Sequence, residues 1–192
     1  MTDGPFRVLV ICTANICRSP MAERLLQRAA GERGLELDVS SAGFLFNGEP
    51  ASAKTAAVMA ERGIDLGDHR SRTVSPELVE QADLVVTMER GHARDLILEN
   101  PSARDRVHTL GGMADALAEA DPSAETPASS RVAQVLRDRP AGDLLGNGPD
   151  EVGDPHGLSK RRHRLARDRI VVLVDALLDG LFASPEDGAD EP

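Results

Sequence analysis

The sequence contains no tryptophan, no tyrosine and only four phenylalanines. Any buried core must therefore be aliphatic, built from Val, Leu, Ile, Ala and Met. Hydrophobic residues make up 41% of the 192 positions, which is enough for one buried core, and a chain of this length is expected to form one domain. The two cysteines, Cys12 and Cys17, lie in one short segment, which excludes a disulfide framework.

Long apolar runs and an excess of positive charge are also missing. The longest apolar run, 170–178, contains Asp175, whereas a membrane-spanning helix needs about 20 apolar residues. Residues 1–5 are short and polar, and 6–12 are too few for the apolar part of a signal peptide. The formal net charge is −10, which argues against nucleic acid or an anionic membrane as the main partner. We expect a cytoplasmic protein in a reducing compartment, without membrane insertion.

Short apolar runs alternate with helical patterns along the chain. Residues 6–11 are apolar and rich in β-branched side chains, which indicates a strand buried on both faces of a parallel sheet. A helix should follow, because Ser19 suits the N-cap and Pro20 the first helical position. The other elements expected are strands at 36–40, 83–87 and 106–109, a turn at 41–43, and helices at 52–62, from 75, at 91–98 and from 159. This alternation predicts an α/β fold, a single-domain parallel four-stranded sheet flanked by helices on both faces.

Two segments depart from this pattern. Residues 111–152 are rich in Ala, Asp, Pro, Gly and Ser, so we expect a low-complexity excursion with one helix at 130–137 and a mobile part. Residues 184–192 are acidic and contain proline, which predicts a disordered tail. The folded domain should therefore cover 1–183.

One segment carries residues suited to chemistry. It connects the first predicted strand to the first helix and reads Cys12-Thr13-Ala14-Asn15-Ile16-Cys17-Arg18-Ser19. In an open α/β sheet, ligands bind at the carboxyl ends of strands. A loop there can turn successive N–H groups inward as an anion nest, and the helix N-terminus adds unpaired N–H groups and a partial positive charge. We call residues 12–19 the phosphate loop, because these features favour phosphate.

The side chains of the phosphate loop predict phosphoryl transfer. Cys12 at the base of the nest would be held as the thiolate, which is the nucleophilic form. Arg18 can offer a planar fork to two phosphate oxygens and stabilise the charge on the transferred group. Ser19 can donate its hydroxyl to the cysteine sulfur and ease its departure. The residues expected to bind phosphate are Thr13, Ala14, Asn15, Ile16, Cys17 and Ser19, and no metal or cofactor is expected.

The run from Val10 to Glu23 resembles the signature of the low-molecular-weight protein tyrosine phosphatases. The resemblance continues through Ser41-Ala42-Gly43, Gly48-Glu49-Pro50, Gly63-Ile64-Asp65, His69-Arg70-Ser71-Arg72, residues 82–88 and Asp154-Pro155. It covers about 6–110 and 153–182. It implies a phosphatase domain that removes phosphate from phosphotyrosine in proteins, through a cysteinyl-phosphate intermediate, and releases inorganic phosphate.

The resemblance also implies roles for distant residues. Asp154 matches the general acid, which protonates the leaving oxygen and then activates water, and Pro155 biases it toward an extended conformation. Cys17 matches a second cysteine that pairs reversibly with Cys12 under oxidation. A buried hydrogen-bond network that shapes the loop is matched by Asn15, Ser19, Ser41 and His69.

The chain departs from the family pattern in three places. His156 stands where an aromatic residue usually follows Asp-Pro. Phe44, Leu45 and Phe46 occupy the variable loop where many members carry Trp or Tyr. Residues 111–152 are longer than the corresponding stretch. The first two departures alter the side chains that wall the crevice against a flat phenyl ring.

Three other functions are compatible with parts of the pattern. Protein-arginine phosphatases resemble the loop but carry a small Thr where this chain has Ile16, so Ile16 favours phosphotyrosine. Thiol-dependent arsenate reductases share the fold, but their relay type uses distal cysteines, and no cysteine follows Cys17. A catalytically silent phosphopeptide-binding module would not need Cys12, Arg18 and Asp154 together. The pattern gives no indication of the oligomeric state.

Overall fold

The computed structural model describes residues 4–120, 126–137, 139–140 and 142–182. The predicted acidic tail, 184–192, lies outside these residues, as does part of the predicted excursion. No helix among the described residues is both long enough and apolar enough to cross a membrane.

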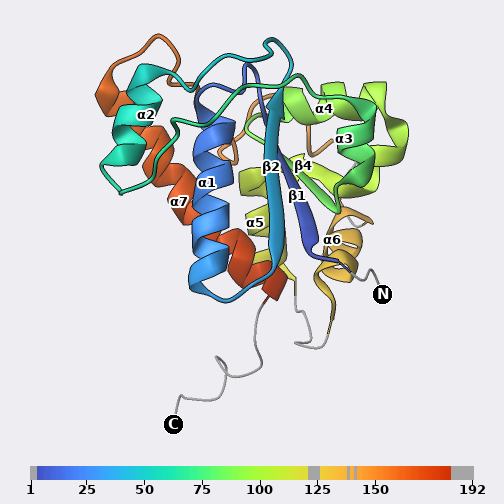
Figure 1. Cartoon of the computed structure of the whole chain (residues 1–192). Coiled ribbons are helices and arrows are strands. Elements are labelled where there is room, and N and C mark those ends of the chain that lie inside the picture. Colours follow the sequence, from blue (N-terminus) through green and yellow to red (C-terminus); the bar gives the residue numbers. More distant parts are fainter. Residues whose placement is uncertain (1–3, 121–125, 138, 141, 183–192) are drawn as a thin grey trace.

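Four parallel strands form the centre of the molecule (Figure 1). They are β1 (Phe6–Cys12), β2 (Leu37–Gly43), β3 (Leu84–Thr87) and β4 (Val107–Thr109). Their order is β2-β1-β3-β4, and all three neighbouring pairs are parallel. The predicted four-stranded parallel sheet is confirmed. The chain crosses from β1 to β2 on one side and later to β3 on the other, so a topological switch point lies at the carboxyl end of β1.

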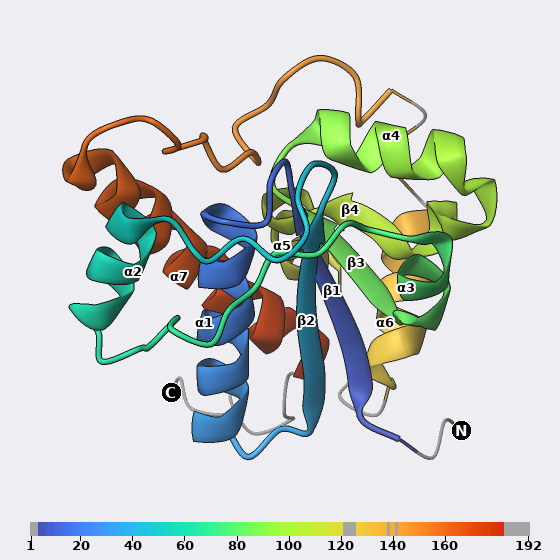
Figure 2. The ribbon, with the colours of Figure 1, turned by 45° about the horizontal axis from the view of Figure 1, so that its top comes forward.

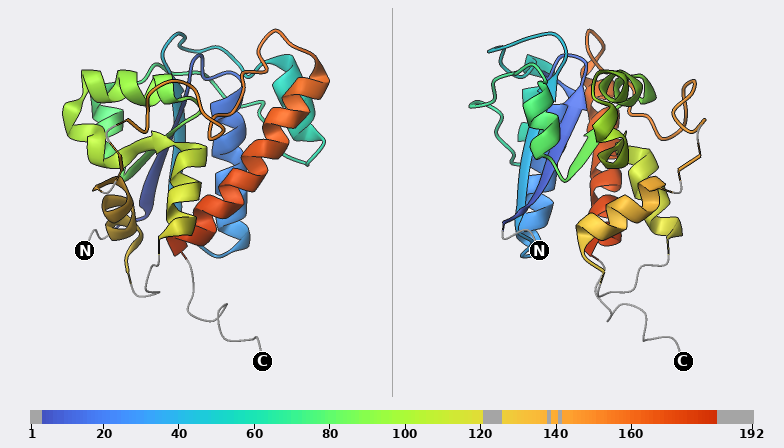
Figure 3. Two further views of the ribbon diagram at one scale, coloured as in Figure 1. Left: turned by 180° about the vertical axis from the view of Figure 1, so that it is seen from behind. Right: turned by 90° about the vertical axis from the view of Figure 1, so that its right-hand side faces the viewer.

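Helices cover both faces of the sheet, as predicted. One face carries α1 (Arg18–Glu32), α5 (Leu110–Glu119) and α7 (Lys160–Phe182), with α2 (Ala53–Ala60) and α6 (Ala128–Arg137) beside them. The other face carries α3 (Pro76–Gln81), α4 (Arg90–Glu99) and the 3-10 helix η1 (Pro101–Arg106). Seen from behind, α5 and α7 lie side by side (Figure 3).

The strand β1 shows why its sequence is continuously apolar. Val8 and Val10 face the aliphatic cluster beneath α1, α5 and α7, whereas Leu9 and Ile11 face the cluster beneath α3 and α4. All four side chains are buried. A strand covered on both faces has no polar side, so alternation is absent from its sequence.

Two local predictions were wrong. Ser41, Ala42 and Gly43 are not a turn but the end of β2, because pairing with β1 continues to Cys12 opposite Gly43. Ser19 does not cap α1, whose N-cap residue is Cys17 without a side-chain capping bond. The Ser19 hydroxyl is instead engaged inside the phosphate loop.

Residues 111–152 also differ from the prediction. The expected helix is present as α6, but α5 was missed, and its residues Leu110, Met113, Ala114 and Leu117 are buried in the core. Thr109 caps α5 by accepting a hydrogen bond from Gly112 N–H. The small Ala and Gly residues between these positions hid an apolar stripe of helical spacing.

Candidate active site

The phosphate loop lies at the switch point, between β1 and α1. Figure 2 shows the connections after β2 and the chain before α7, drawn in orange, meeting at the same end of the sheet. Cys12 is the last residue of β1, and Arg18 is the first residue of α1. Both side chains are buried. The loop therefore joins the two elements over a very short span, which forces its backbone into a tight curve.

Backbone contacts with neighbouring segments hold the phosphate loop. Phe44 N–H donates to Thr13 O at 2.8 Å, and Ser52 N–H donates to Ile16 O at 2.9 Å. Gly43 packs directly against the loop, since a Cβ atom there would lie 2.7 Å from a backbone nitrogen of the loop. Any larger residue at Gly43 would push the loop away from the end of β2.

Asn15 is the centre of the network that shapes the loop. Its φ of 54° is in the left-handed region, which is costly for most residues other than glycine. Its Nδ2 donates to Ser19 Oγ at 2.9 Å and Ser41 Oγ at 2.8 Å. Its Oδ1 accepts from Arg72 N–H at 2.9 Å, and its carbonyl accepts from His69 Nε2 at 2.7 Å. The structure thus brings Asn15, Ser19, Ser41 and His69 into one set of hydrogen bonds.

The sulfur of Cys12 has a hydroxyl partner. Ser19 Oγ lies 3.0 Å from Cys12 Sγ. Since Ser19 Oγ already accepts from Asn15, its own hydrogen is available to the sulfur, and its other neighbour, Ala42 O, is farther away at 3.5 Å. A hydroxyl that donates to sulfur stabilises the thiolate and makes it a better leaving group.

The guanidinium of Arg18 is buried, and groups in the described part of the chain bind its two terminal nitrogens but not its Nε. Its side chain is 1% exposed. Nη1 donates to the Glu89 carboxylate and to Val152 O at 3.0 Å. Nη2 lies 3.1 Å from Thr13 Oγ1 and 3.1 Å from Asp154 Oδ2. Nε is buried and has no hydrogen-bond partner among the described residues. A buried donor without a partner is costly, and an oxyanion in the loop would satisfy it.

Asp154 is brought to the phosphate loop from far along the chain. Its Oδ2 pairs with Arg18, and its Oδ1 accepts from His156 N–H at 3.0 Å. The adjacent Pro155 is buried, whereas Asp154 itself is exposed. The carboxyl group therefore reaches the buried arginine while remaining open to solvent, which suits a group that exchanges protons.

Cys17 and the ring of His156 meet on the other side of the loop. Cys17 Sγ lies 3.4 Å from Ser52 Oγ and 3.9 Å from His156 Nδ1. Burial raises the pKa of the Cys17 thiol, so this sulfur is kept neutral. Cys12 and Cys17 are not joined by a disulfide.

Two residues at the site were missed by the sequence analysis. Glu89 binds Arg18, and His92 Nε2 lies 3.1 Å from Thr13 Oγ1. The His92 ring stacks on Phe44 with centroids 5.5 Å apart, and burial lowers the pKa of His92. A signal for Glu89 existed, because it follows a buried strand at the carboxyl edge of the sheet, where ligands bind.

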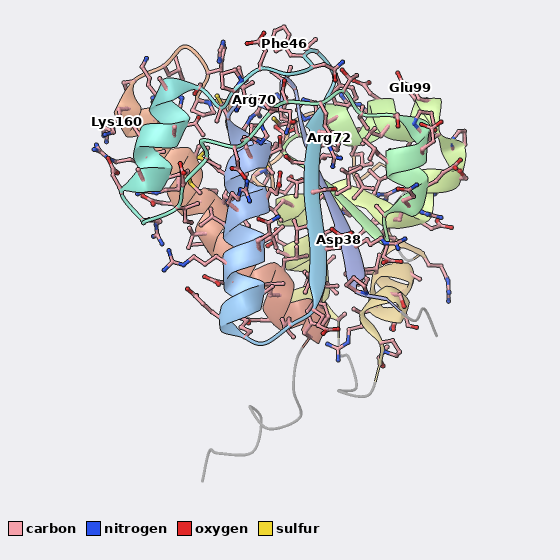
Figure 4. All side chains as sticks on the ribbon, viewed as in Figure 1. Asp38, Phe46, Arg70, Arg72, Glu99 and Lys160 are labelled. Atoms are coloured by element: carbon pink, nitrogen blue, oxygen red, sulfur yellow. The ribbon has the colours of Figure 1, made fainter. Side chains whose placement is uncertain are left out.

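The rim of the site carries apolar and basic groups. Leu45 and Phe46 are exposed, and Figure 4 shows Phe46 above Arg70 and Arg72 at the loop-bearing end of the molecule. Arg72 is fixed by its Nε, which donates to Ser41 O at 2.7 Å.

Comparisons with known proteins agree with this geometry. A family model described as low molecular weight phosphotyrosine protein phosphatase matches residues 7–135. The chain is 39% identical over 107 residues to a Ralstonia solanacearum protein named probable low molecular weight protein-tyrosine-phosphatase EpsP, a match covering 55% of this chain and 71% of that protein. It is 31% identical over 179 residues to the protein-arginine-phosphatase of Geobacillus stearothermophilus, covering 92% and 97%.

A solved structure extends the likeness to nearly the whole fold. It is the low molecular weight protein tyrosine phosphatase from T. tengcongensis, with a TM-score of 0.71 at 28% identity, covering 91% of this chain and 98% of that one. The chain therefore belongs to the low molecular weight phosphotyrosine protein phosphatase family.

Proposed function

We propose that this phosphatase hydrolyses phosphotyrosine in proteins, with Cys12 as nucleophile, Arg18 as phosphate ligand and Asp154 as general acid. The observation that carries the proposal is the unpartnered Arg18 Nε, buried beside the Cys12 loop while Nη1 is held away by Glu89. A phosphoryl group can take the free edge of the guanidinium in a two-pronged contact.

The reaction follows in two steps. Cys12 Sγ attacks phosphorus, and the bond to the tyrosine oxygen breaks as Asp154 gives that oxygen a proton. The Asp154 carboxylate then takes a proton from water, which attacks the cysteinyl phosphate. The S–P bond breaks, inorganic phosphate leaves, and the thiolate returns with the Ser19 hydroxyl as donor. The loop amides and Arg18 stabilise the charge on the transferred group throughout.

The ion pair between Arg18 and Asp154 provides a way for substrate binding to favour protonation of the Asp154 carboxyl. Asp154 Oδ2 pairs with Arg18 Nη2 at 3.1 Å. A phosphate dianion that takes this donor removes the positive partner and adds negative charge, and both changes favour the protonated carboxyl. The incoming substrate thereby helps to protonate its own acid.

Asp154→Asn should slow hydrolysis of a phosphotyrosine peptide more than hydrolysis of p-nitrophenyl phosphate. The tyrosine oxygen leaves poorly without a proton, whereas nitrophenolate needs little help. The expected loss for the peptide is on the order of 10²–10⁴, as for general acid catalysis. The measurement is kcat/KM for both substrates.

His156→Ala is the matched control for that experiment. The His156 ring lies at Cys17, so its removal should alter substrate binding more than leaving-group dependence. A steeper leaving-group dependence in His156→Ala than in Asp154→Asn would make His156 the acid and contradict the assignment.

A second candidate function is hydrolysis of phosphoarginine. It is favoured by the match to the protein-arginine-phosphatase over 92% of the chain. Against it stands Ile16, half-buried in the phosphate loop. An apolar branched side chain suits a flat phenyl ring, whereas a hydroxyl at that position would suit a guanidinium group.

Parallel turnover of phosphotyrosine and phosphoarginine peptides separates the two functions. The native protein should prefer phosphotyrosine, and Ile16→Thr should shift the ratio of kcat/KM toward phosphoarginine by roughly tenfold, the effect of one or two side-chain atoms in a pocket. A native preference for phosphoarginine would reverse the order of the two candidates.

We further infer that the protein acts in a reducing cytosol, where two free thiols at one site persist. Under oxidation Cys17 would pair with Cys12 and protect the nucleophile from further oxidation. Turnover of arsenate by an external thiol is a weaker alternative, since the sequence has only two cysteines and a relay needs a further resolving thiol.

A further inference from the structure

A buried carboxylate outside the phosphate loop has no part in the reaction described above. Asp150 is 5% exposed. Its Oδ1 accepts from Arg90 Nε at 2.9 Å and forms an ion pair with Arg90 Nη2 at 2.7 Å, and its Oδ2 accepts from Thr109 Oγ1 at 2.6 Å. Burial opposes the charge on Asp150, yet the hydrogen bonds from Arg90 and Thr109 lower its pKa. A buried charge this well satisfied holds its backbone in one place.

The partners of Asp150 belong to the rigid end of the sheet. Thr109 is the last residue of β4, and Arg90 is the first residue of α4, just beyond β3. The backbone of Asp150 is also pressed onto the start of α5, since a Cβ atom at Gly111 would lie 2.3 Å from Asp150 O. The carboxylate thus fastens an irregular segment to β4 and α4, and the backbone of Asp150 packs against α5.

The same segment leads directly to Asp154. After Asp150, the Glu151 carboxylate accepts from Arg90 N–H at 2.9 Å. Val152 N–H then donates to Met88 O at 2.9 Å, and Val152 O accepts from Arg18. Each of residues 150–152 is therefore bonded to the sheet end or to the phosphate loop.

We propose that Asp150 is a positioning residue for the reaction: its carboxylate fixes the 150–152 segment so that Asp154 reaches the leaving oxygen. This inference rests on the proposed role of Asp154. Catalytic groups misplaced by about 1 Å can lose on the order of 10² in rate. Loosening the segment should therefore weaken proton donation first, because Cys12 is held by other contacts and Arg18 keeps its bond to Glu89 when the bond to Val152 O is weakened.

Asp143 offers a matched control for Asp150, because both residues line the same cavity. Asp143 pairs with His108 Nε2 at 2.9 Å, and a cavity of about 490 Å³ is lined by Asp143, His108 and Asp150 alike. Asp143 bonds to His108 and not to residues 150–154 among the contacts of the described chain. Asp143→Asn removes a carboxylate from the same cavity but leaves the hydrogen bonds of Asp150 to Arg90 and Thr109 in place.

The experiment is a double-mutant cycle on two substrates. Asp150→Asn keeps the shape of the side chain and removes its charge. We expect it to lower kcat/KM for a phosphotyrosine peptide by roughly 10–100-fold and for p-nitrophenyl phosphate by much less. In an Asp154→Asn background the same change should add little. Asp143→Asn should leave the ratio of the two substrates unchanged.

Each other outcome has a definite meaning. If Asp150→Asn slows both substrates equally, or costs as much in the Asp154→Asn background, Asp150 has only a structural role and the proposal is overturned. If Asp154→Asn alone shows no leaving-group preference, the general acid itself is wrong, whatever Asp150 does. Should Asp150→Asn fail to fold, Thr109→Val is held to the same criteria; it removes the hydrogen bond to Asp150 and also the bond by which Thr109 caps α5.

Discussion

Cys12→Ser is expected to abolish hydrolysis while phosphate or tungstate binding survives in part. The serine oxygen is not ionised near neutral pH and is a poor nucleophile without a base, so the covalent intermediate is lost. Removing the nucleophile of a covalent enzyme can cost on the order of 10⁶ in kcat. The proposed anion nest consists of backbone N–H groups and Arg18, none of which the substitution removes.

Loss of hydrolysis and survival of anion binding are measured separately. Turnover of a phosphotyrosine peptide measures catalysis, and calorimetric titration with tungstate measures anion binding by the phosphate loop. Near-normal turnover in Cys12→Ser would falsify the mechanism. Loss of both turnover and tungstate binding would instead place the thiolate charge among the determinants of the loop's shape, and thermal unfolding would then show whether the loop is still folded.

Arg18→Lys is expected to be nearly as damaging as Arg18→Ala. The guanidinium uses Nη1 for Glu89 and Val152 O and leaves Nε for phosphate. A lysine side chain has one nitrogen, which cannot bind both Glu89 and Val152 O and also make a two-pronged contact with phosphate. Arginines that stabilise phosphoryl transfer are worth about 10³–10⁵ in kcat.

The check is kcat with a saturating phosphotyrosine peptide for both variants, together with phosphate affinity. Arg18→Lys should recover part of the affinity, because it keeps the charge, but little of the rate. Recovery of most of the rate by lysine would mean that charge alone suffices, and the two-pronged contact would have to be abandoned.

Much of the site could be predicted because it is local in sequence. Cys12, Arg18 and Ser19 lie on one strand–loop–helix unit, so the elements that position them can be recognised from neighbouring residues. Asp154 lies far along the chain, and only the resemblance to a family indicated it. Residue composition carries no information about a contact over such a separation.

Other parts of the site depend on which strands are neighbours. Glu89 reaches Arg18 because β3 lies beside β1, and Asp150 reaches Thr109 because the 148–152 segment crosses the end of β4. Alternating strands and helices predict a parallel sheet but not the order of its strands. These carboxylates were therefore missed, although Asp150 is buried and Glu89 pairs with the buried Arg18.

The packing of α7 has a consequence for how the protein folds during synthesis. Its apolar stripe closes the cluster beneath α1 and α5, through Ile170, Leu173, Val174, Leu177, Leu178 and Leu181. Contacts between segments so far apart in sequence form slowly. A nascent chain that already contains the phosphate loop but not α7 leaves the apolar cluster beneath α1 and α5 partly exposed and open to aggregation. Competence to bind phosphate should therefore emerge late in translation, in one cooperative step, rather than when the loop itself leaves the ribosome.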